Sequence, residues 1–185
     1  SSAASDVYKR QTEEDKKVLA EGSVDYIGFS YYMSNTVDSN SVRDISMTTD
    51  GSSEHSVKNP FICETAWGWA IDPEGLRYTL NMFYERYEKP LFIVENGFGA
   101  IDVKEEDGSC HDPYRIDYLK RHIEELKKAC DDGCRVLAYC TWSYTDLLSW
   151  LNGYQKRYGF VYVDRFNDGH GTLERKLKDS YYRYK

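Results

Sequence analysis

The sequence lacks the features that mark membrane, nucleic-acid-binding and secreted proteins. No apolar run approaches the ~18 residues of a membrane-spanning helix, so no membrane association is expected. Basic residues are in the minority, with 24 against 31 acidic ones and a net charge of -7, which argues against a nucleic-acid partner. No charged start followed by an apolar core marks a signal peptide, and we therefore expect a cytoplasmic protein.

The sequence also lacks paired cysteines. Its five cysteines are an odd number without CxxC spacing, and no histidine lies at a recognised metal-ligand interval from them. These residues are Cys63, Cys110, Cys130, Cys134 and Cys140. We expect reduced thiols rather than a zinc site, and neither a metal nor another cofactor is predicted.

What the sequence does contain is enough apolar material for a globular core. Apolar residues make up 41% of the 185 residues, and charged residues make up 30%. The chain is nevertheless short for a large α/β barrel, which needs about 250 residues. Residues 1–11, SSAASDVYKRQ, show no periodicity, and we interpret them as a disordered or non-native tail. Residues 12–185 are predicted to form part of one domain.

Predicted strands and helices alternate along this domain. Three nearly continuous apolar runs predict strands. These runs are VDYIGFSYY (24–32), LFIV (91–94) and RVLAYCTWS (135–143). Helical patterns cover residues 12–22, 71–89 and 112–131, and another begins at residue 179. The first of these opens with a capping pattern at Thr12, with Asp15 three residues later, and is stopped by Gly22. This order is typical of a parallel sheet covered by helices, so an α/β fold is predicted.

The pattern also predicts a long loop and a helix with a buried apolar stripe. Residues 33–60 are rich in Ser, Asn, Asp and Thr and are expected to form a long loop, which in a compact protein is usually functional or mobile. In the helix over 112–131, apolar residues recur every three or four positions and predict a buried stripe. The stripe consists of Ile116, Leu119, Ile123, Leu126 and Cys130.

Aromatic residues and carboxylates gather where the predicted strands end. The three strands lead into SYYMS, ENGFG and TWSYTD, so the second strand ends at Glu95. At any one strand end, such residues are explained as ordinary polar loop residues. Three such ends in succession favour a functional site, because the active sites of parallel sheets lie at the carboxyl ends of the strands. Aromatic faces suit sugars, and a carboxylate among them suggests a glycoside hydrolase. A retaining glycosidase needs two carboxyl groups roughly 5–5.5 Å apart.

Several motifs resemble the retaining β-glycosidases of glycoside hydrolase family 1, which are (β/α)8 barrels. IVENG is similar to the nucleophile motif after the seventh strand, which implies Glu95 as nucleophile. DYIGFSYY resembles the end of the sixth strand, where Tyr32 would hydrogen-bond the nucleophile. WGWAIDPEGLR resembles the leaving-group wall, with Trp69 as the wall and Trp67 as a support. TWSYTDLLSW resembles the eighth strand's end, where Trp142 would lie against the sugar.

The resemblance is incomplete in two respects. Ser30 stands where relatives of this family carry Asn, so the polar contact of that Asn is not expected here. The TxNE-type motif of the general acid and the first five strands have no counterpart, which implies the C-terminal part of a (β/α)8 TIM barrel, about strands 6 to 8, inactive by itself. Glu64 and Glu74 are weak substitutes for the acid, because they precede or open a helix instead of ending a strand.

The stretch LLSWLNGYQKRYGFVYVD, residues 147–164, bears on the substrate. Ser149, Lys156 and Tyr158 resemble the phosphate site of the family's 6-phospho-β-glycosidases, where Ser replaces a Glu that would repel a phosphate dianion. Trp150 resembles a residue that goes with 6-phosphogalactosides, although dual gluco and galacto specificity is plausible. The implied partner is a 6-phosphorylated β-glycoside. A β-glucosidase acting on unphosphorylated substrates and an inactive sugar-phosphate-binding half-barrel remain alternatives, and the oligomeric state is left open.

Overall fold

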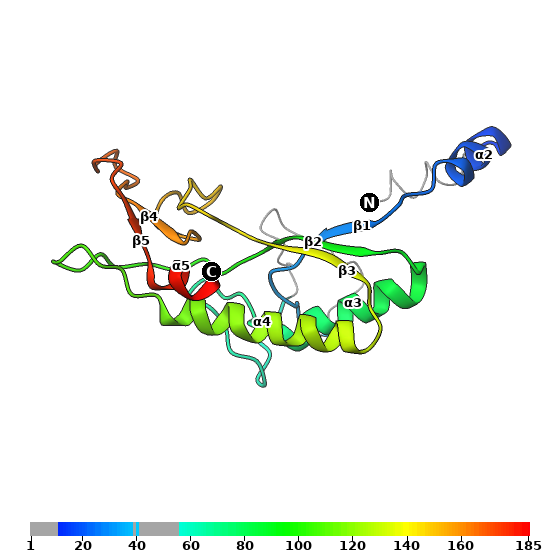
Figure 1. The fold of residues 1–185 in the computed structure, drawn as a ribbon, viewed down its shortest axis with the longest axis horizontal. Coiled ribbons are helices and arrows are strands. Elements are labelled where there is room, and N and C mark those ends of the chain that lie inside the picture. Colours follow the sequence, from blue (N-terminus) through cyan, green and yellow to red (C-terminus); the bar gives the residue numbers. More distant parts are fainter. Residues whose placement is uncertain (1–10, 39, 41–55) are drawn as a thin grey trace.

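The structure, a computed structural model, describes residues 11–38, 40 and 56–185. The predicted tail lies outside the described residues except for Gln11, as do residues 39 and 41–55 of the predicted long loop. In chain order the elements are α2 (Glu13–Glu21), β1 (Ile27–Ser30), α3 (Pro73–Tyr87), β2 (Leu91–Asn96), α4 (Pro113–Asp131), β3 (Val136–Thr141), β4 (Val161–Val163), β5 (Arg175–Leu177) and α5 (Asp179–Tyr184) (Figure 1).

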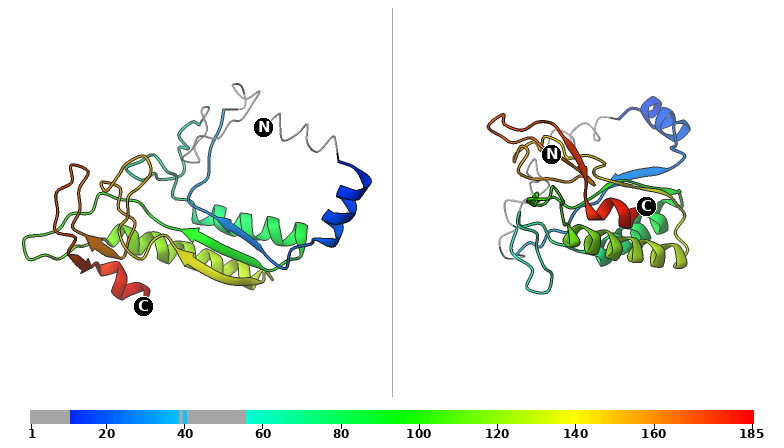
Figure 2. Two further views of the ribbon diagram at one scale, coloured as in Figure 1. Left: turned by 90° about the horizontal axis from the view of Figure 1, so that it is seen from above. Right: turned by 60° about the vertical axis from the view of Figure 1, so that its left-hand side comes forward.

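Helix α2 begins at a capping box that the sequence predicts. The side chain of Thr12 accepts a hydrogen bond from the backbone N–H of Asp15, whose carboxylate accepts one from the backbone N–H of Thr12. The helix ends at Gly22. No residue of α2 is buried, and the helix lies at one end of the molecule (Figures 1 and 2). Its formation therefore depends on local capping and not on packing.

Strands β1, β2 and β3 form a parallel sheet in that spatial order, which confirms the predicted parallel pairing. Helices α3 and α4 run along one face of this sheet (Figures 1 and 2). Each helix begins with a proline in its first turn, where the missing N–H costs nothing. The layers are therefore one sheet and, on one side of it, two helices.

The main apolar core lies between the sheet and these helices. Leu76 and Leu80 from α3 and Leu91 and Ile93 from β2 are completely buried. The other side of the sheet is open, and Leu137 on β3 is 51% exposed. Parallel sheets are normally covered on both faces, so the apolar side chains on the open face of this sheet need another part of the protein to bury them.

The predicted apolar stripe of α4 is only partly correct. Leu119 is buried, but Ile123 is 39% exposed and Cys130 is also exposed. The helix instead buries polar groups, among them Arg115 and His122. Arg115 is paired with Asp102 and Asp112, and His122 stacks on Tyr118 and bonds through Nδ1 to the Tyr118 carbonyl, although Nε of Arg115 and Nε2 of His122 have no hydrogen-bond partner among the described residues.

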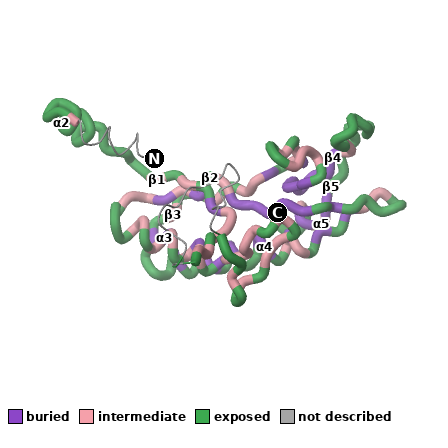
Figure 3. The backbone as a smooth tube through the Cα atoms, turned by 180° about the vertical axis from the view of Figure 1, so that it is seen from behind, coloured by how far each residue is buried: buried purple, intermediate pink, exposed green. Residues whose placement is uncertain are grey.

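Beyond β3 the chain forms a small antiparallel hairpin of β4 and β5, followed by α5. The sequence predicts α5 but not the hairpin, because strands of three residues are too short to show a period. Figure 3 shows buried residues at β4, where Tyr162 is nearly inaccessible, as is Phe160 just before the strand, whereas the residues of β5 are exposed. Phe160 packs in one apolar cluster with Phe98, Ala100, Tyr118 and Leu119, so the C-terminal region shares its core with α4 and with the segment that follows β2.

The loop after β1 is closed where its described ends meet. The described ends of the predicted loop pair with each other, through an antiparallel bridge between Val37 and Ser56 and a 2.8 Å hydrogen bond from the Val57 N–H to the Thr36 carbonyl. Within the described ranges, no helix has the length and apolar character needed to cross a membrane. All five cysteines are free thiols.

Candidate active site

Glu95 lies on β2 next to the last residue of β1. The pairing of β1 with β2 shifts register between Phe29 and Ser30, so that Ser30 pairs with Glu95. The backbone N–H of Tyr31 then donates to the Glu95 carbonyl at 2.9 Å. Such an irregularity at a strand end re-aims a side chain, and here Ser30 and Tyr32 reach the Glu95 carboxylate while Tyr31 bonds the Glu95 backbone.

Two hydroxyl groups bind the Glu95 carboxylate. The Tyr32 hydroxyl donates to Oε2 at 2.9 Å, as the sequence predicts, and the Ser30 hydroxyl donates to the same oxygen at 3.2 Å. Burial raises the pKa of Tyr32 strongly, and its hydrogen bond to Glu95 raises it further, so this phenol stays protonated and remains a donor. The contact from Ser30 was not expected from the sequence.

The residues that follow Glu95 fix its strand against β3. Asn96 is completely buried and donates to the carbonyl of Tyr31 at 2.7 Å, while its own carbonyl accepts the Trp142 N–H at 2.8 Å. A Cβ at Gly97 would lie 1.8 Å from the Trp142 carbonyl oxygen. Only glycine permits this approach, so Gly97 is required for Trp142 to reach the site. The peptide bond between Trp142 and Ser143 is cis.

A pocket of about 400 Å³ opens beside Glu95. It brings together all eight residues that the sequence predicts for the site. These are Tyr32, Trp69, Glu95, Trp142, Ser149, Trp150, Lys156 and Tyr158. Leu147, Leu151 and Asn152 complete the lining and were not predicted. The site therefore combines the ends of β1, β2 and β3 with a loop at residues 147–156, here called the pocket loop.

Lys156 lies against aromatic rings in this pocket. Its Nζ is 3.4 Å from the centroid of the Trp69 ring and 5.3 Å from that of Trp67, which are cation–π distances. Trp69 also packs edge-on against Tyr32, with ring centroids 5.6 Å apart. Trp69 thus contacts both Tyr32, the hydrogen-bond donor to Glu95, and Lys156, while Trp67 lies outside the pocket lining.

Tyr158 lies close to both Lys156 and Ser149, with the Lys156 ammonium 5.6 Å from the centroid of its ring. Burial raises the pKa of Tyr158 to about 12, although a hydrogen bond with Ser149 opposes this rise. Ser149 also exchanges two 2.9 Å backbone hydrogen bonds with Gly153, which close the pocket loop into a tight turn. Trp150 lines the pocket mouth with a side chain that is 88% exposed.

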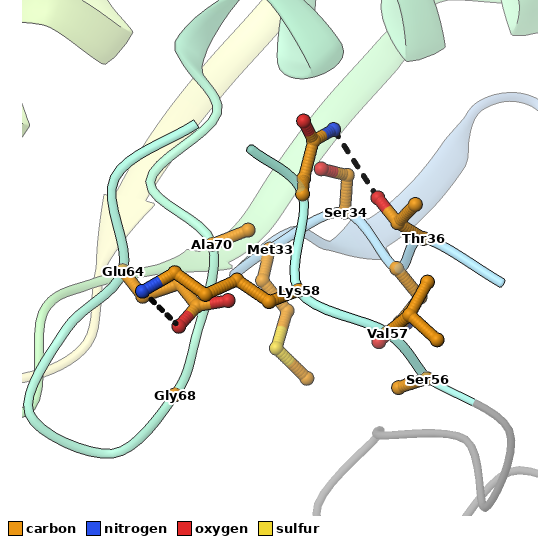
Figure 4. A pocket seen from close by; sticks show the side chains of 11 residues that line it. Met33, Ser34, Thr36, Ser56, Val57, Lys58, Glu64, Gly68 and Ala70 are labelled. Carbon is orange, nitrogen blue, oxygen red and sulfur yellow. Dashed lines mark hydrogen bonds and ion pairs between the residues drawn. The ribbon is translucent and has the colours of Figure 1, made fainter. Parts of the chain in front are cut away.

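Glu95 is the only carboxylate among the described residues that line this pocket. Glu64 instead lines a separate pocket of about 180 Å³, where its Oε2 lies 3.6 Å from the Lys58 ammonium (Figure 4). Glu74 lies in the first turn of α3. Neither residue lines the pocket of Glu95, in agreement with the prediction that both are weak substitutes for the general acid. In the part of the chain that the structure describes, no group of three or more His, Cys, Asp or Glu residues is arranged to hold a metal ion.

Residues 4–185 match the model of glycosyl hydrolase family 1. The chain belongs to this family. It is 55% identical over 174 residues to the aryl-phospho-β-D-glucosidase BglA of Bacillus subtilis, covering 92% of this chain and 36% of that protein. It is 49% identical over 174 residues to a 6-phospho-β-glucosidase of Dickeya chrysanthemi, covering 94% of this chain and 37% of that protein.

Solved structures agree with this assignment. The chain superposes on the β-glucosidase of Thermotoga maritima in complex with castanospermine with a TM-score of 0.74 and 35% identity, covering 96% of this chain and 38% of that one. The predicted fold class, the C-terminal part of a (β/α)8 barrel, is confirmed. The chain spans little more than a third of the length of the relatives it matches.

Proposed function

We propose that the protein to which this chain belongs is a retaining β-glycosidase that hydrolyses 6-phospho-β-glycosides, gluco or galacto, in the cytoplasm. The observation that carries the proposal is the pocket itself, whose lining contains Glu95 at a strand end, Ser149 and Lys156 on the pocket loop, and Tyr158 just after this loop. The names of two similar relatives, an aryl-phospho-β-D-glucosidase and a 6-phospho-β-glucosidase, support the phosphorylated substrate and favour the gluco configuration.

In the proposed mechanism Glu95 is the nucleophile. Its carboxylate attacks the anomeric carbon, the bond to the leaving oxygen breaks, and a covalent glycosyl ester forms that water later hydrolyses. The hydroxyl groups of Tyr32 and Ser30 hold Oε2, which orients the attacking carboxylate. Because Glu95 is the pocket's only carboxylate among the described residues, we propose that the acid that protonates the leaving group comes from a part of the protein outside this chain.

The phosphate of the substrate is proposed to bind at Ser149, Lys156 and Tyr158. The lysine supplies a positive charge and the two hydroxyls supply donors, which suits a dianion. The protonated state of Tyr158, whose pKa is raised to about 12, keeps its hydroxyl a donor at neutral pH. A glutamate at position 149 would place a negative charge beside the phosphate, so Ser149 itself favours a phosphorylated sugar.

A β-glucosidase acting on unphosphorylated sugars is the second candidate. The observation that favours it is the 36% identity to β-glucosidase A of Thermotoga maritima, together with the superposition on a β-glucosidase structure from the same organism. This identity is lower than the 55% shared with the aryl-phospho-β-D-glucosidase, and we therefore rank it second.

A two-substrate comparison tests the proposal in the full-length protein. The kcat/KM values of an aryl 6-phospho-β-glucoside and of the matching unphosphorylated glucoside are measured for wild type, Lys156→Ala and Ser149→Glu. Charge-assisted hydrogen bonds contribute about 1.5–3 kcal/mol each, so Lys156→Ala should lower kcat/KM for the phosphorylated substrate by roughly ten- to a hundredfold and leave the other nearly unchanged. Ser149→Glu should reduce activity on the phosphorylated substrate further.

Two results would contradict the proposal. A wild-type enzyme without preference for the phosphorylated substrate would assign the second candidate function. Equal losses on both substrates in the two variants would mean that these residues only support the pocket's shape. Repeating the comparison with the 6-phospho-β-galactoside measures the gluco to galacto ratio, and Trp150→Ala is the variant that should change it.

A further inference from the structure

The pocket loop carries the proposed phosphate contacts but contributes little of its own packing, since Trp150 and Leu151 are 88% and 65% exposed. We propose that Asp146, Arg157 and Asn167 are positioning residues that hold this loop at its base and tip, and that they thereby determine selectivity for the phosphorylated substrate. The inference rests on the function proposed above for the same site.

The base of the loop is closed by an ion pair between the residues on either side of it. Asp146 directly precedes the loop and Arg157 directly follows it, and Nη1 of Arg157 lies 3.1 Å from Oδ2 of Asp146. Both side chains are almost inaccessible, with exposures of 1% and 4%. The other carboxylate oxygen of Asp146 accepts the N–H of Gly159 at 2.9 Å. Lys156 and Tyr158 are the immediate neighbours of Arg157 in the chain, so this pair places both of them.

This ion pair belongs to a larger buried cluster, here called the charge network. It contains three carboxylates and three cations and is thus balanced in charge. Its members are Asp102, Asp112, Asp146, Arg115, Arg157 and Lys178. Lys178 lies 2.7 Å from Asp146 and also binds Asp102, and Asp102 is paired with Arg115 on α4 at 3.1 Å. Through this chain of contacts the loop base is fixed to a long helix.

The guanidinium of Arg157 ties the loop base to the hairpin as well. Its two terminal nitrogens donate to the carbonyls of Val163 and Arg165 at 2.8 and 2.9 Å. These are bonds of a planar fork with fixed geometry, which a lysine would not reproduce. The backbone at Arg157 also bonds to Ala100 in both directions, at 2.8 and 2.9 Å, close to Gly99. A Cβ at Gly99 would lie 2.6 Å from Cε of Lys156, so the lysine is confined between these segments.

The tip of the loop is held by Asn167, which lies between β4 and β5. Its Oδ1 accepts the N–H of Tyr154 at 2.6 Å, and its Nδ2 donates to the Asn152 carbonyl at 3.4 Å. A Cβ at Gly153 would lie 2.1 Å from the same Oδ1, so the loop approaches this side chain closely. Asn167 itself is exposed, and its removal leaves no buried group unpaired.

A loop held at both ends loses less conformational freedom when it binds a ligand than a free one does. A phosphate needs its three donors at defined positions, because hydrogen bonds to a charged group weaken when their distance and angle depart from the optimum. The unphosphorylated sugar makes no such demand on the loop. Weakening either anchor should therefore reduce activity on the phosphorylated substrate selectively, mainly through KM.

The role of the ion pair at the base of the pocket loop is tested by comparing two buried aspartates of the charge network in the full-length protein. Asp146→Asn weakens the anchor of the loop, whereas Asp112→Asn removes an equally buried charge whose partners are Arg115 and Ser180 on α4 and α5. Both should lower the unfolding temperature. Only Asp146→Asn should raise KM for the 6-phosphorylated aryl glucoside, by about tenfold, with kcat and the unphosphorylated substrate within about twofold of wild type.

The role of Asn167 at the tip of the pocket loop is tested with Asn167→Ala. This variant also tests whether anchoring of the loop determines substrate selectivity if Asp146→Asn does not fold. Losing the two neutral hydrogen bonds to Tyr154 and Asn152 should raise KM for the phosphorylated substrate by about fivefold, without a change in unfolding temperature. Unchanged substrate preference in a folded Asp146→Asn or in Asn167→Ala would overturn the inference, as would an equal change in Asp112→Asn. A wild-type enzyme with no preference for the phosphorylated substrate would instead overturn the proposed function, and this inference with it.

Discussion

The sheet region and the C-terminal region hold their functional groups by different forces. In the sheet region, β1 to β3 and the helices α3 and α4 bury leucines and isoleucines, and Glu95 is fixed by strand pairing. In the C-terminal region, six buried charged side chains connect α4, the pocket loop, the hairpin and the start of α5.

This difference separates the proposed chemistry from the proposed specificity. Strand pairing is made by backbone hydrogen bonds that do not depend on charged side chains, and it gives a rigid support for a nucleophile. Paired charges are directional, and each one depends on its partner, because an unpaired buried charge is costly. We therefore expect changes in the sheet region to affect all substrates alike, and changes in the charge network to affect stability and the phosphorylated substrate.

The largest expected effect is that of Glu95→Gln in the sheet region. Removing the proposed nucleophile should lower kcat by roughly 10⁴-fold or more on both the phosphorylated and the unphosphorylated substrate, because the same attack is lost. Binding of a 6-phosphorylated sugar, measured by calorimetry, should stay near the wild-type value. A variant that loses only one of the two activities would break the separation proposed here.

The second effect concerns the charge network. Arg115→Met leaves Asp102 and Asp112 without one of their cations and should lower the free energy of unfolding by about 3–5 kcal/mol. Denaturant unfolding of the full-length protein measures this loss. Arg77→Ala, which breaks an exposed pair with Asp132, is the matched control and should cost less than about 1 kcal/mol. Similar losses in the two variants would show that burial of the network contributes nothing.

The third effect is a pH dependence that arises on the inner face of α4. His122 is completely inaccessible and stacks on Tyr118, and burial lowers its pKa to about 4. The unfolded chain binds a proton near pH 6.5, so stability should fall by about 3 kcal/mol as the pH drops from 6.5 to 4. His122→Phe should remove this part of the acid sensitivity. An unchanged pH profile in that variant would assign the sensitivity to other groups.

The smallest effect has the opposite sign and lies at the start of α5. His111 is exposed, and its hydrogen bond to Asp179 at 2.7 Å raises its pKa. A raised pKa adds stability that is complete below pH 6.5 and is lost as the pH rises through the folded-state value. His111→Gln should therefore lower the unfolding temperature slightly at pH 6 and not at pH 9. High salt should reduce the difference, because the pair is exposed.

The sequence alone determined the local features and the identity of the pocket residues. The capping box at Thr12, the strand at LFIV and the helix that opens at Pro113 follow from patterns within a few residues. Glu95 was predicted because a carboxylate directly follows an apolar strand, a signal that is also local. The eight pocket residues were predicted as a set from motifs in their order along the chain.

Only the tertiary structure decided how these pieces are held together. Lys178 and Asp102 bind each other across 76 positions in the sequence, and Ser30 reaches Glu95 across 65. No period or motif connects such residues, because their partners are brought close by the folding of the intervening chain. For the same reason Ile123, apolar and correctly spaced, is 39% exposed while Arg115 is buried: burial on α4 depends on what packs against each face, and the pattern along the helix does not contain that information.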